Sequence, residues 1–232
     1  MATLSIVIPV YNEKNTIRTL LRRVEDIRLL HGEIEIIVVD DGSSDGTRKI
    51  LTEEFSNKHR VIMHDKNQGK GAAIRTGLAH ASGDIFVIQD ADLEYDPKDI
   101  EKLFAYMQEK KLDVLYGSRV LEKGTKEYSS LLFHIGGTLV TFWTNLLYGT
   151  TLTDEATCYK MFTRKAYQSF TLTCKGFEFC PEFTGKALRA GFSIAEIPIS
   201  YHPRSASEGK KIKPRDGLIA LWTLLKIRLW NK

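Results

Sequence analysis

The stretch IFVIQDADLE, residues 85–94, decides the fold because it joins an apolar strand to closely spaced carboxylates. Its apolar start is typical of a parallel strand that is covered on both faces. Asp90 and Asp92 follow at once, and a straight strand would point them to opposite sides, so we expect the chain to turn here. In an open α/β sheet, ligands bind beyond the carboxyl ends of the strands. We therefore expect this strand end to form part of a binding site.

Strand-like and helix-like segments alternate along the rest of the chain. Apolar runs predict strands at residues 4–10, 34–39, 61–64, 114–116, 158–162 and 194–200, and helical periodicity predicts helices at 17–27, 47–55, 71–81, 97–108 and 181–190. Neither a GxGxxG turn nor a P-loop follows the first strand, which disfavours dinucleotide-binding and P-loop folds. The alternation predicts an α/β fold in a single domain, with a mostly parallel sheet and helices on both faces.

The composition is that of an ordinary globular protein. Of 232 residues, 43% are hydrophobic and 27% are charged, which argues against a disordered or fibrous chain. Cys158, Cys174 and Cys180 form no CxxC pair and are odd in number, which argues against a disulfide framework or a zinc cluster. With no secretory leader visible, we expect a cytoplasmic protein. The net charge of +4 is concentrated near the C-terminus, where it suits an anionic partner, and we expect no nucleic-acid partner.

Two segments bear on contact with a membrane. Residues 129–153 contain no Asp, Glu, Lys or Arg, but glycine and polar residues dilute their hydrophobicity, so a buried or interfacial helix is a better interpretation than a membrane span. Residues 214–232 combine apolar side chains with Trp222, Trp230 and several cations, which suits a helix on a membrane surface. A terminal helix docked on the core is the alternative. We therefore divide the chain into a domain at 1–213 and an amphipathic helix at 214–232.

Asp90 and Asp92 also indicate a metal site. Carboxylates that emerge together from a buried strand need a compensating cation. Their oxygen atoms suit hard Mg²⁺ or Mn²⁺ ions, and Glu94 adds another ligand two positions further on. The alternative is that these side chains merely cap the next helix, because an isolated DxD pattern is common.

Four motifs follow one another along the chain. They are IVIPVYNE at 6–13, VVDDGSSDGT at 38–47, NQGKG at 67–71 and DADLE at 90–94. In this order they resemble the motifs of the family 2 glycosyltransferases, and most closely those of the branch that acts on polyprenyl phosphates. The resemblance implies the GT-A fold, a Rossmann-like fold that binds nucleotide sugars.

The resemblance also implies roles for individual residues. The nucleoside would be held by Pro9, Tyr11, Glu13 and Asp40, and the rest of the donor would be lined by Lys70, Asp90, Ala91 and Arg119. A loop that closes over the diphosphate would carry Arg204 and Lys210. The Mg²⁺ or Mn²⁺ ion would be bound by Asp92 and Glu94. Catalysis would depend on Asp92, Asp154 and Arg119, with Arg119 facing a phosphate. Lys160 stands where the family has an arginine, so it keeps the charge but lacks the bidentate fork.

Together these features predict an inverting glycosyltransferase. We expect it to move a hexose from a donor of the UDP-glucose or GDP-mannose type to a polyprenyl or dolichyl phosphate, while bound peripherally to the cytoplasmic face of a membrane. A phosphate acceptor needs no general base, whereas a sugar hydroxyl would need a carboxylate such as Asp154 to take its proton. Transfer to a sugar hydroxyl in cell-surface polysaccharide synthesis is therefore the alternative. From another class, the alternative is a non-catalytic protein that binds nucleotide sugars.

Overall fold

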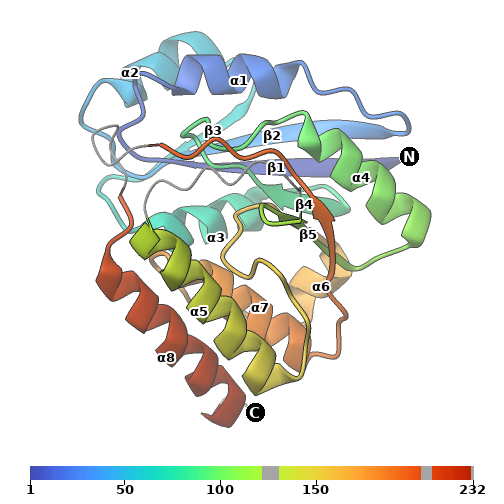
Figure 1. The fold of residues 1–232 in the computed structure, drawn as a ribbon. Helices are drawn as coiled ribbons and strands as arrows, with labels where there is room; N and C mark the ends of the chain where they lie inside the picture. The colour runs from blue at the N-terminus through green and yellow to red at the C-terminus, as the bar shows by residue number, and fades with distance from the viewer. Residues whose placement is uncertain (122–130, 205–210, 231–232) are drawn as a thin grey trace.

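A seven-stranded sheet runs through the middle of the protein, and helices lie on both of its faces (Figure 1). This computed structural model describes residues 1–121, 131–204 and 211–230. The strands are β1 (Ala2–Val10), β2 (Gly32–Asp40), β3 (Arg60–Met63), β4 (Ile85–Ile88), β5 (Val114–Ser118), β6 (Lys160–Thr163) and β7 (Ala195–Pro198). Every strand predicted from the sequence is present, with ends that differ by a few residues.

The predicted helices are also present. They are α1 (Ile17–Glu25), α2 (Thr47–Ile50), α3 (Lys70–His80), α4 (Asp99–Lys110), α5 (Leu131–Tyr148), α6 (Arg164–Gln168), α7 (Phe179–Arg189) and α8 (Pro214–Trp230). The helix expected over residues 47–55 changes its hydrogen-bonding pattern part of the way along, because a π-helical turn, η1 (Leu51–Phe55), continues α2. The short α6 was not predicted.

The strand order is β3-β2-β1-β4-β6-β5-β7, and the sheet is mostly parallel as predicted. The exception is β6, which runs antiparallel to both of its neighbours, β4 and β5. On the parallel side, Val10 at the end of β1 pairs with Asp40 at the end of β2, and Val7 pairs with Ile88 at the end of β4. This register brings the segments after β1, β2 and β4 to one edge of the sheet.

The core explains why these strand ends are rigid. The side chains of β1 from Leu4 to Val10 are almost completely buried between the two helical layers. On α1, Ile17, Leu20, Leu21 and Val24 recur at helical spacing and are also buried. Side chains that leave this packed frame at the carboxyl edge therefore start from well-fixed positions.

The uncharged segment forms α5, which lies beside α8 on one side of the molecule (Figure 1). Val140 of α5 packs against Ala220 and Leu224 of α8. The indole nitrogen of Trp143 donates a hydrogen bond to the backbone oxygen of Leu221 at 3.3 Å. In the described ranges, none of the helices has the length and apolar character needed to cross a bilayer. On the side away from this contact, α5 keeps Phe142 and Leu146 exposed at 60% and 63%.

Candidate active site

The chain turns immediately after β4, as expected for Asp90 and Asp92. Residues 91–94 form a turn and bend, and Leu93 has a φ of 63°, in the left-handed region that non-glycine residues rarely adopt. The backbone N–H of Glu94 donates to Asp92 Oδ1 at 3.2 Å. The turn therefore presents neighbouring carboxylates at the edge of the sheet.

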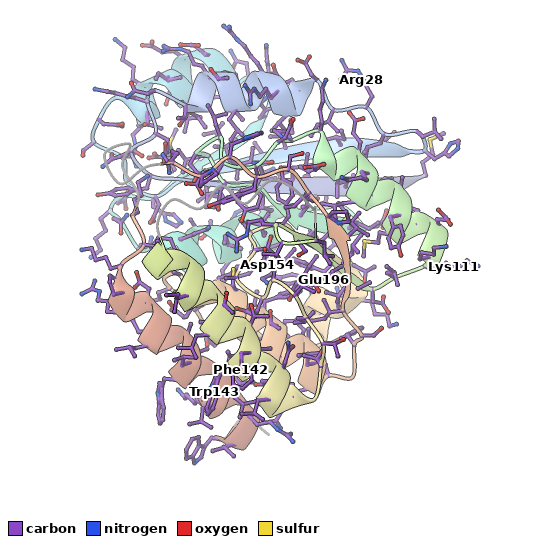
Figure 2. All side chains as sticks on the ribbon, in the orientation of Figure 1. Arg28, Lys111, Phe142, Trp143, Asp154 and Glu196 are labelled. Atoms are coloured by element: carbon purple, nitrogen blue, oxygen red, sulfur yellow. The ribbon has the colours of Figure 1, made fainter. Side chains whose placement is uncertain are left out.

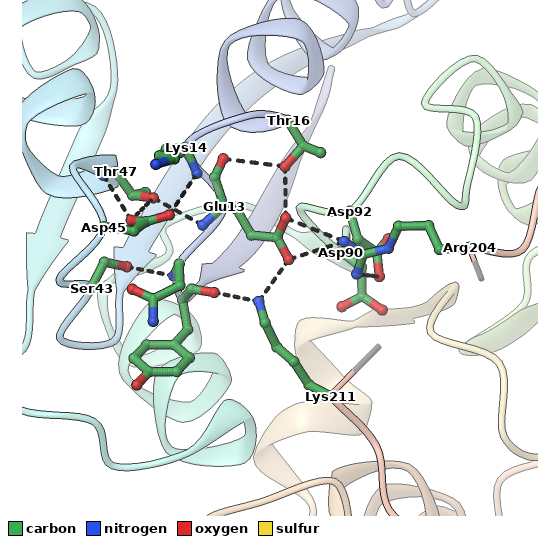
Figure 3. Close-up of polar contacts among 12 residues, drawn as sticks. Glu13, Lys14, Thr16, Ser43, Asp45, Thr47, Asp90, Asp92, Arg204 and Lys211 are labelled. Carbon is green, nitrogen blue, oxygen red and sulfur yellow. Dashed lines mark hydrogen bonds and ion pairs between the residues drawn. The ribbon is translucent and has the colours of Figure 1, made fainter. Parts of the chain in front are cut away.

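Arg204 lies among the carboxylates of Glu13, Asp92 and Glu94, and Figure 3 shows its contacts with the first two. Its Nη2 atom is 3.0 Å from Asp92 Oδ2, and its Nη1 atom is 3.4 Å from Glu13 Oε2. Its backbone N–H donates to Glu94 Oε1 at 2.9 Å. Lys211 adds a second cation, with Nζ 2.7 Å from Glu13 Oε1 and bonded to the backbone oxygen of Tyr11. The segment after β7 thus carries positive charge onto the carboxylates that follow β1 and β4.

The electrostatic balance of this cluster is incomplete. Burial and the nearby charges of Asp90 and Glu94 raise the pKa of Asp92 to about 7, although Arg204 acts in the opposite direction. A carboxyl that is this hard to ionise lies in a region with too little positive charge.

That imbalance bears on the predicted metal site. Within residues 1–121, 131–204 and 211–230, no group of three or more His, Cys, Asp or Glu side chains is arranged to hold a metal ion. Both Glu94 oxygens are engaged, one by Arg204 and the other by the hydroxyl of Tyr201 at 2.7 Å. The hard oxygen donors and the excess of negative charge around Asp92 nevertheless fit a divalent cation such as Mg²⁺ or Mn²⁺.

Lys70 and Asp90 form a second ion pair at the edge. Lys70 Nζ is 2.7 Å from Asp90 Oδ1, and both side chains are mostly buried. Lys70 begins α3 directly after Gly69, which has a φ of 101°. A Cβ atom on Gly69 would clash with the backbone oxygen of Lys175, so only glycine fits here. This tight junction fixes the point from which Lys70 reaches the site.

Asp41 holds the loop in front of Lys70. Its Oδ2 accepts the backbone N–H of Gly69 at 2.8 Å, and its Oδ1 accepts that of Gln68 at 2.9 Å. The Nδ1 atom of His64 lies 2.7 Å from the same Oδ1. The second aspartate of the DDG motif therefore serves the loop rather than the open edge of the sheet.

The residues predicted to hold a nucleoside meet at the ends of β1 and β2. Pro9 and Asp40 are buried within these strands, and Tyr11 and Glu13 follow β1. Arg48 Nε donates to Asp40 Oδ2 at 2.9 Å, whereas Asp40 Oδ1 is buried without a hydrogen-bond partner among the described residues. Asp40 thus keeps one acceptor without a protein partner among the described residues, at a side chain that has no exposed surface in this arrangement.

Arg119 and Asp154 are joined by a bidentate ion pair. Arg119 Nε and Nη2 each lie 2.7 Å from an oxygen of Asp154, and the Arg119 backbone N–H donates to Oδ2 at 3.0 Å. Burial alone would raise the pKa of the Asp154 carboxyl, but the charge and hydrogen bonds of Arg119 hold it below its usual value. The guanidinium also lies 5.1 Å from the ring centre of Tyr201, which in turn bonds to Glu94. Arg119 is therefore connected to the carboxylate cluster through Tyr201.

The structure brings the predicted site residues that it describes to one edge of the sheet, and it adds Lys211 and Tyr201 to them. Ala91 is buried in the turn between Asp90 and Asp92. Lys210 lies outside the described residues. Sequence reasoning missed the contacts of Lys211, for which its place in a basic stretch was a signal, and of Tyr201, for which no motif gave a signal.

Comparison with known proteins agrees with this geometry. Residues 5–170 match the profile of Glycosyl transferase family 2. The low-salt glycan biosynthesis hexosyltransferase Agl6 of Haloferax volcanii is 30% identical over 234 residues, which cover 99% of this chain and 54% of the relative. The chain thus spans about half the length of that relative. The UDP-N-acetylglucosamine–dolichyl-phosphate N-acetylglucosaminyltransferase of Methanococcus voltae is 31% identical over 230 residues, covering 89% of each protein.

A solved structure supports the fold. The glucosyl-3-phosphoglycerate synthase of Mycobacterium tuberculosis, crystallised with Mn²⁺, uridine diphosphate and phosphoglyceric acid, superposes with a TM-score of 0.72 at 20% identity. The match covers all of this chain and 80% of that one. The family profile and the relatives that align over most of its length show that this chain belongs to glycosyl transferase family 2, and its GT-A architecture agrees with that assignment.

Proposed function

We propose that this protein is a metal-dependent, inverting hexosyltransferase that acts on a nucleotide diphosphate sugar and a polyprenyl phosphate. Its family makes it a glycosyltransferase. The observation that carries the finer assignment is the meeting of Asp92, Glu94 and Arg204 at the carboxyl edge of the sheet. Buried carboxylates that share a cation there suit the charged diphosphate and metal of a sugar donor.

The nucleoside end of the donor would lie over the ends of β1 and β2. Tyr11 offers a ring face for the base, and Asp40, whose Oδ1 has no partner among the described residues, would accept a hydrogen bond from the base or the ribose once donor binding uncovers it. Pro9 shapes the end of β1, and Glu13 adds an acceptor beside Tyr11. This placement supports a donor whose diphosphate extends toward Asp92.

The diphosphate would meet the cations around the turn after β4. Lys70, Arg119 and Arg204 are each held by a carboxylate, which orients their charges before the donor binds. Lys210 would join them from the loop over the site. Asp90 and Ala91 would line the sugar.

A divalent ion would be held by Asp92 and Glu94. When bound, it would neutralise the charge that grows on the nucleotide diphosphate leaving group. Arg204 would add to that stabilisation once it turns from Asp92 toward the diphosphate. Direct in-line attack on the anomeric carbon would invert its configuration.

The state of Asp154 favours a phosphate acceptor. Both of its oxygens accept hydrogen bonds from Arg119, and its lowered pKa makes it a poor proton acceptor. A phosphate oxyanion is already nucleophilic at neutral pH and needs orientation rather than deprotonation. The relative from Methanococcus voltae, named for a dolichyl-phosphate acceptor, supports the same choice. Asp154 would then act in catalysis by holding Arg119.

We place the protein peripherally on the cytoplasmic face of a membrane. Between α5 and α8 lies a groove of about 400 Å³, lined by Leu139, Trp143, Leu221, Trp222 and Leu225. Phe142 and Trp230 are 60% and 62% exposed beside it, and Lys226 and Arg228 supply positive charge on α8. Apolar, aromatic and basic side chains in this combination suit the headgroup region of a bilayer. The segment 214–232 would thus be the membrane-surface helix appended to the domain at 1–213.

The test is transfer of radiolabelled sugar from UDP-glucose, UDP-N-acetylglucosamine or GDP-mannose, with Mn²⁺, to dolichyl or undecaprenyl phosphate. We expect label in an organic-soluble product that mild acid releases, and none after chelation of the metal. Label in a water-soluble or polysaccharide product would support the sugar-hydroxyl alternative. Donor binding without transfer to any acceptor would support the non-catalytic alternative.

A further inference from the structure

A buried ion pair, formed by Glu155 and Lys160, lies next to Asp154, the partner of Arg119. Lys160, the first residue of β6, and Glu155 are both completely buried, and Lys160 Nζ lies 3.9 Å from Glu155 Oε1. Lys160 Nζ also donates to the backbone oxygen of Glu155 at 2.6 Å. The Lys160 ammonium is buried among protein groups, so its charge is used inside the protein.

The surroundings of this pair hold it in one arrangement. Lys160 Nζ sits 3.7 Å from the ring centre of Tyr116 and 3.4 Å from the hydroxyl of Thr184. The same hydroxyl donates to Glu155 Oε1 at 2.9 Å and contacts the Tyr116 hydroxyl at 2.7 Å. Side chains from β5, β6 and α7 therefore converge on the segment that carries Glu155.

The same segment carries Asp154. The backbone N–H of Asp154 donates to Glu196 Oε1 at 2.9 Å, and that of Glu155 donates to the Thr141 hydroxyl at 3.1 Å. Figure 2 shows Asp154 and Glu196 close together in the middle of the molecule. Asp154 is thus fixed from one side by β7 and from the other through Glu155 by the buried pair.

The charges alternate along this chain of contacts. Arg119 pairs with Asp154, which precedes Glu155, which pairs with Lys160. Lys160 also contributes to the lowering of the Asp154 pKa, after the larger contributions of Arg119. Removal of the positive charge of Lys160 would therefore weaken the field that keeps Asp154 ionised and aligned with Arg119.

Stability alone does not account for this pair. Glu155 Oε2 is buried with no hydrogen-bond partner among the described residues, and burial raises the pKa of Glu155 despite the charge of Lys160. Replacement of a buried ion pair by neutral side chains of similar volume is often neutral or stabilising. The burial of these two charges does not favour folding, and the pair lies next to Asp154, which holds Arg119. This combination indicates that the pair has a positioning role.

We infer that Glu155 and Lys160 are positioning residues that set the orientation of Arg119 through Asp154. The consequence for transfer rests on the proposed function, because it requires Arg119 to face a phosphate. The position at which the family has an arginine is in this chain an internal support rather than a substrate contact.

The test compares the charge-balanced variant Glu155→Gln/Lys160→Met with Arg119→Lys and with the triple variant. In the Glu155→Gln/Lys160→Met protein we expect a wild-type melting temperature and a kcat reduced about 10-fold to 100-fold, as for a misplaced catalytic group. In the Arg119→Lys background the same pair of changes would have no further effect, because they act through Arg119. Independent, multiplicative effects, or wild-type kcat in the paired variant, would overturn the inference.

A second readout does not depend on transfer. The Nε–H resonance of Arg119, identified by its absence in Arg119→Lys, should be sharp in the wild type and shifted or broadened in the paired variant. An unchanged resonance would contradict the positioning role. If the wild type transfers no sugar to any polyprenyl phosphate, the proposed function fails and this resonance alone decides the inference. Should the paired variant not fold, Thr184→Val, which removes the hydroxyl shared by both side chains, gives the same comparison.

Discussion

Arg204 Nη2 and Asp92 Oδ2 form an ion pair at 3.0 Å, although the two residues are 112 positions apart in the sequence. In this arrangement the guanidinium occupies the place beside Asp92 where a divalent ion would contribute its charge. Metal and arginine would therefore compete for the same carboxylate until a diphosphate gives the arginine another partner.

Substitution of Arg204 by alanine should change metal and donor binding in opposite directions. Loss of the competing cation should tighten the binding of Mn²⁺ alone. Loss of a charge-assisted contact to the diphosphate should weaken donor binding in the presence of Mn²⁺ by about 1.5–3 kcal/mol. Calorimetric titrations with each ligand would measure both effects. Arg18→Ala, at an exposed pair with Glu54, is the control, and parallel changes in both affinities would contradict the exchange.

Metal binding should depend on the protonation of Asp92. Because its pKa is raised to about 7, a proton must leave before the carboxylate can bind a cation. Mn²⁺ affinity should therefore increase about tenfold between about pH 6 and about pH 8 and then level off. The Asp92→Asn protein should bind Mn²⁺ weakly at both values and lose transfer, whereas Asp113→Asn at the surface should retain both. A pH-independent affinity in the wild type would contradict this reading.

The Arg119–Asp154 pair should make folding stability fall at low pH. The folded pKa of Asp154 lies below 3.8, its usual value, so its contribution is complete above that pH and is lost as the pH falls through the folded value. In urea unfolding, Asp154→Asn should cost about 3–5 kcal/mol at neutral pH, because Arg119 loses its buried partner. The difference in the free energy of unfolding between the wild type and Asp154→Asn should shrink as the pH falls below 3.8. A gap that is constant with pH would contradict the ion pair.

Two glycines with similar backbone conformations offer a matched test of the loop before Lys70. Gly69 and Gly46 have φ values of 101° and 104°, but a Cβ atom meets the Lys175 backbone at Gly69 and nothing within 4 Å at Gly46. Gly46→Ala should cost about 1–2 kcal/mol from backbone strain alone. Gly69→Ala should cost more and should also reduce donor affinity, because the clash displaces Lys70. Equal losses of stability in the two variants would show that the junction has room for a side chain.

The face formed by α5 and α8 should bind anionic vesicles. Trp222 and Trp230 are 56% and 62% exposed, and their combined replacement by alanine should weaken binding about tenfold or more. Sedimentation with phosphatidylglycerol vesicles measures the effect, with neutral vesicles showing the share that depends on charge. The control is Leu30→Ala, because Leu30 is 87% exposed but lies in the loop between α1 and β2, outside this face. Equal binding of wild type and double variant would contradict membrane docking through this face.

The sequence was sufficient to predict the alternating elements and the residues at the strand ends. Period-two and period-3.6 patterns are local, and the apolar run before Asp90 leaves little choice about where β4 ends. The place of β6 could not be predicted in this way, because its antiparallel pairing between β4 and β5 depends on contacts far apart in the chain. The partners of Arg204 and Lys211 were hidden for the same reason, since each reaches Glu13 across most of the sequence.

The position of β6 also affects how the chain folds as it is made. β3, β2, β1 and β4 bond to one another, so this half of the sheet can assemble once residue 88 has left the ribosome. β5 pairs with β6 and β7, both of which are synthesised later. Until residue 160 emerges, the edge of β4 and the whole of β5 present open backbone groups to other nascent chains. The danger of aggregation is therefore greatest between the emergence of β4 and that of β6.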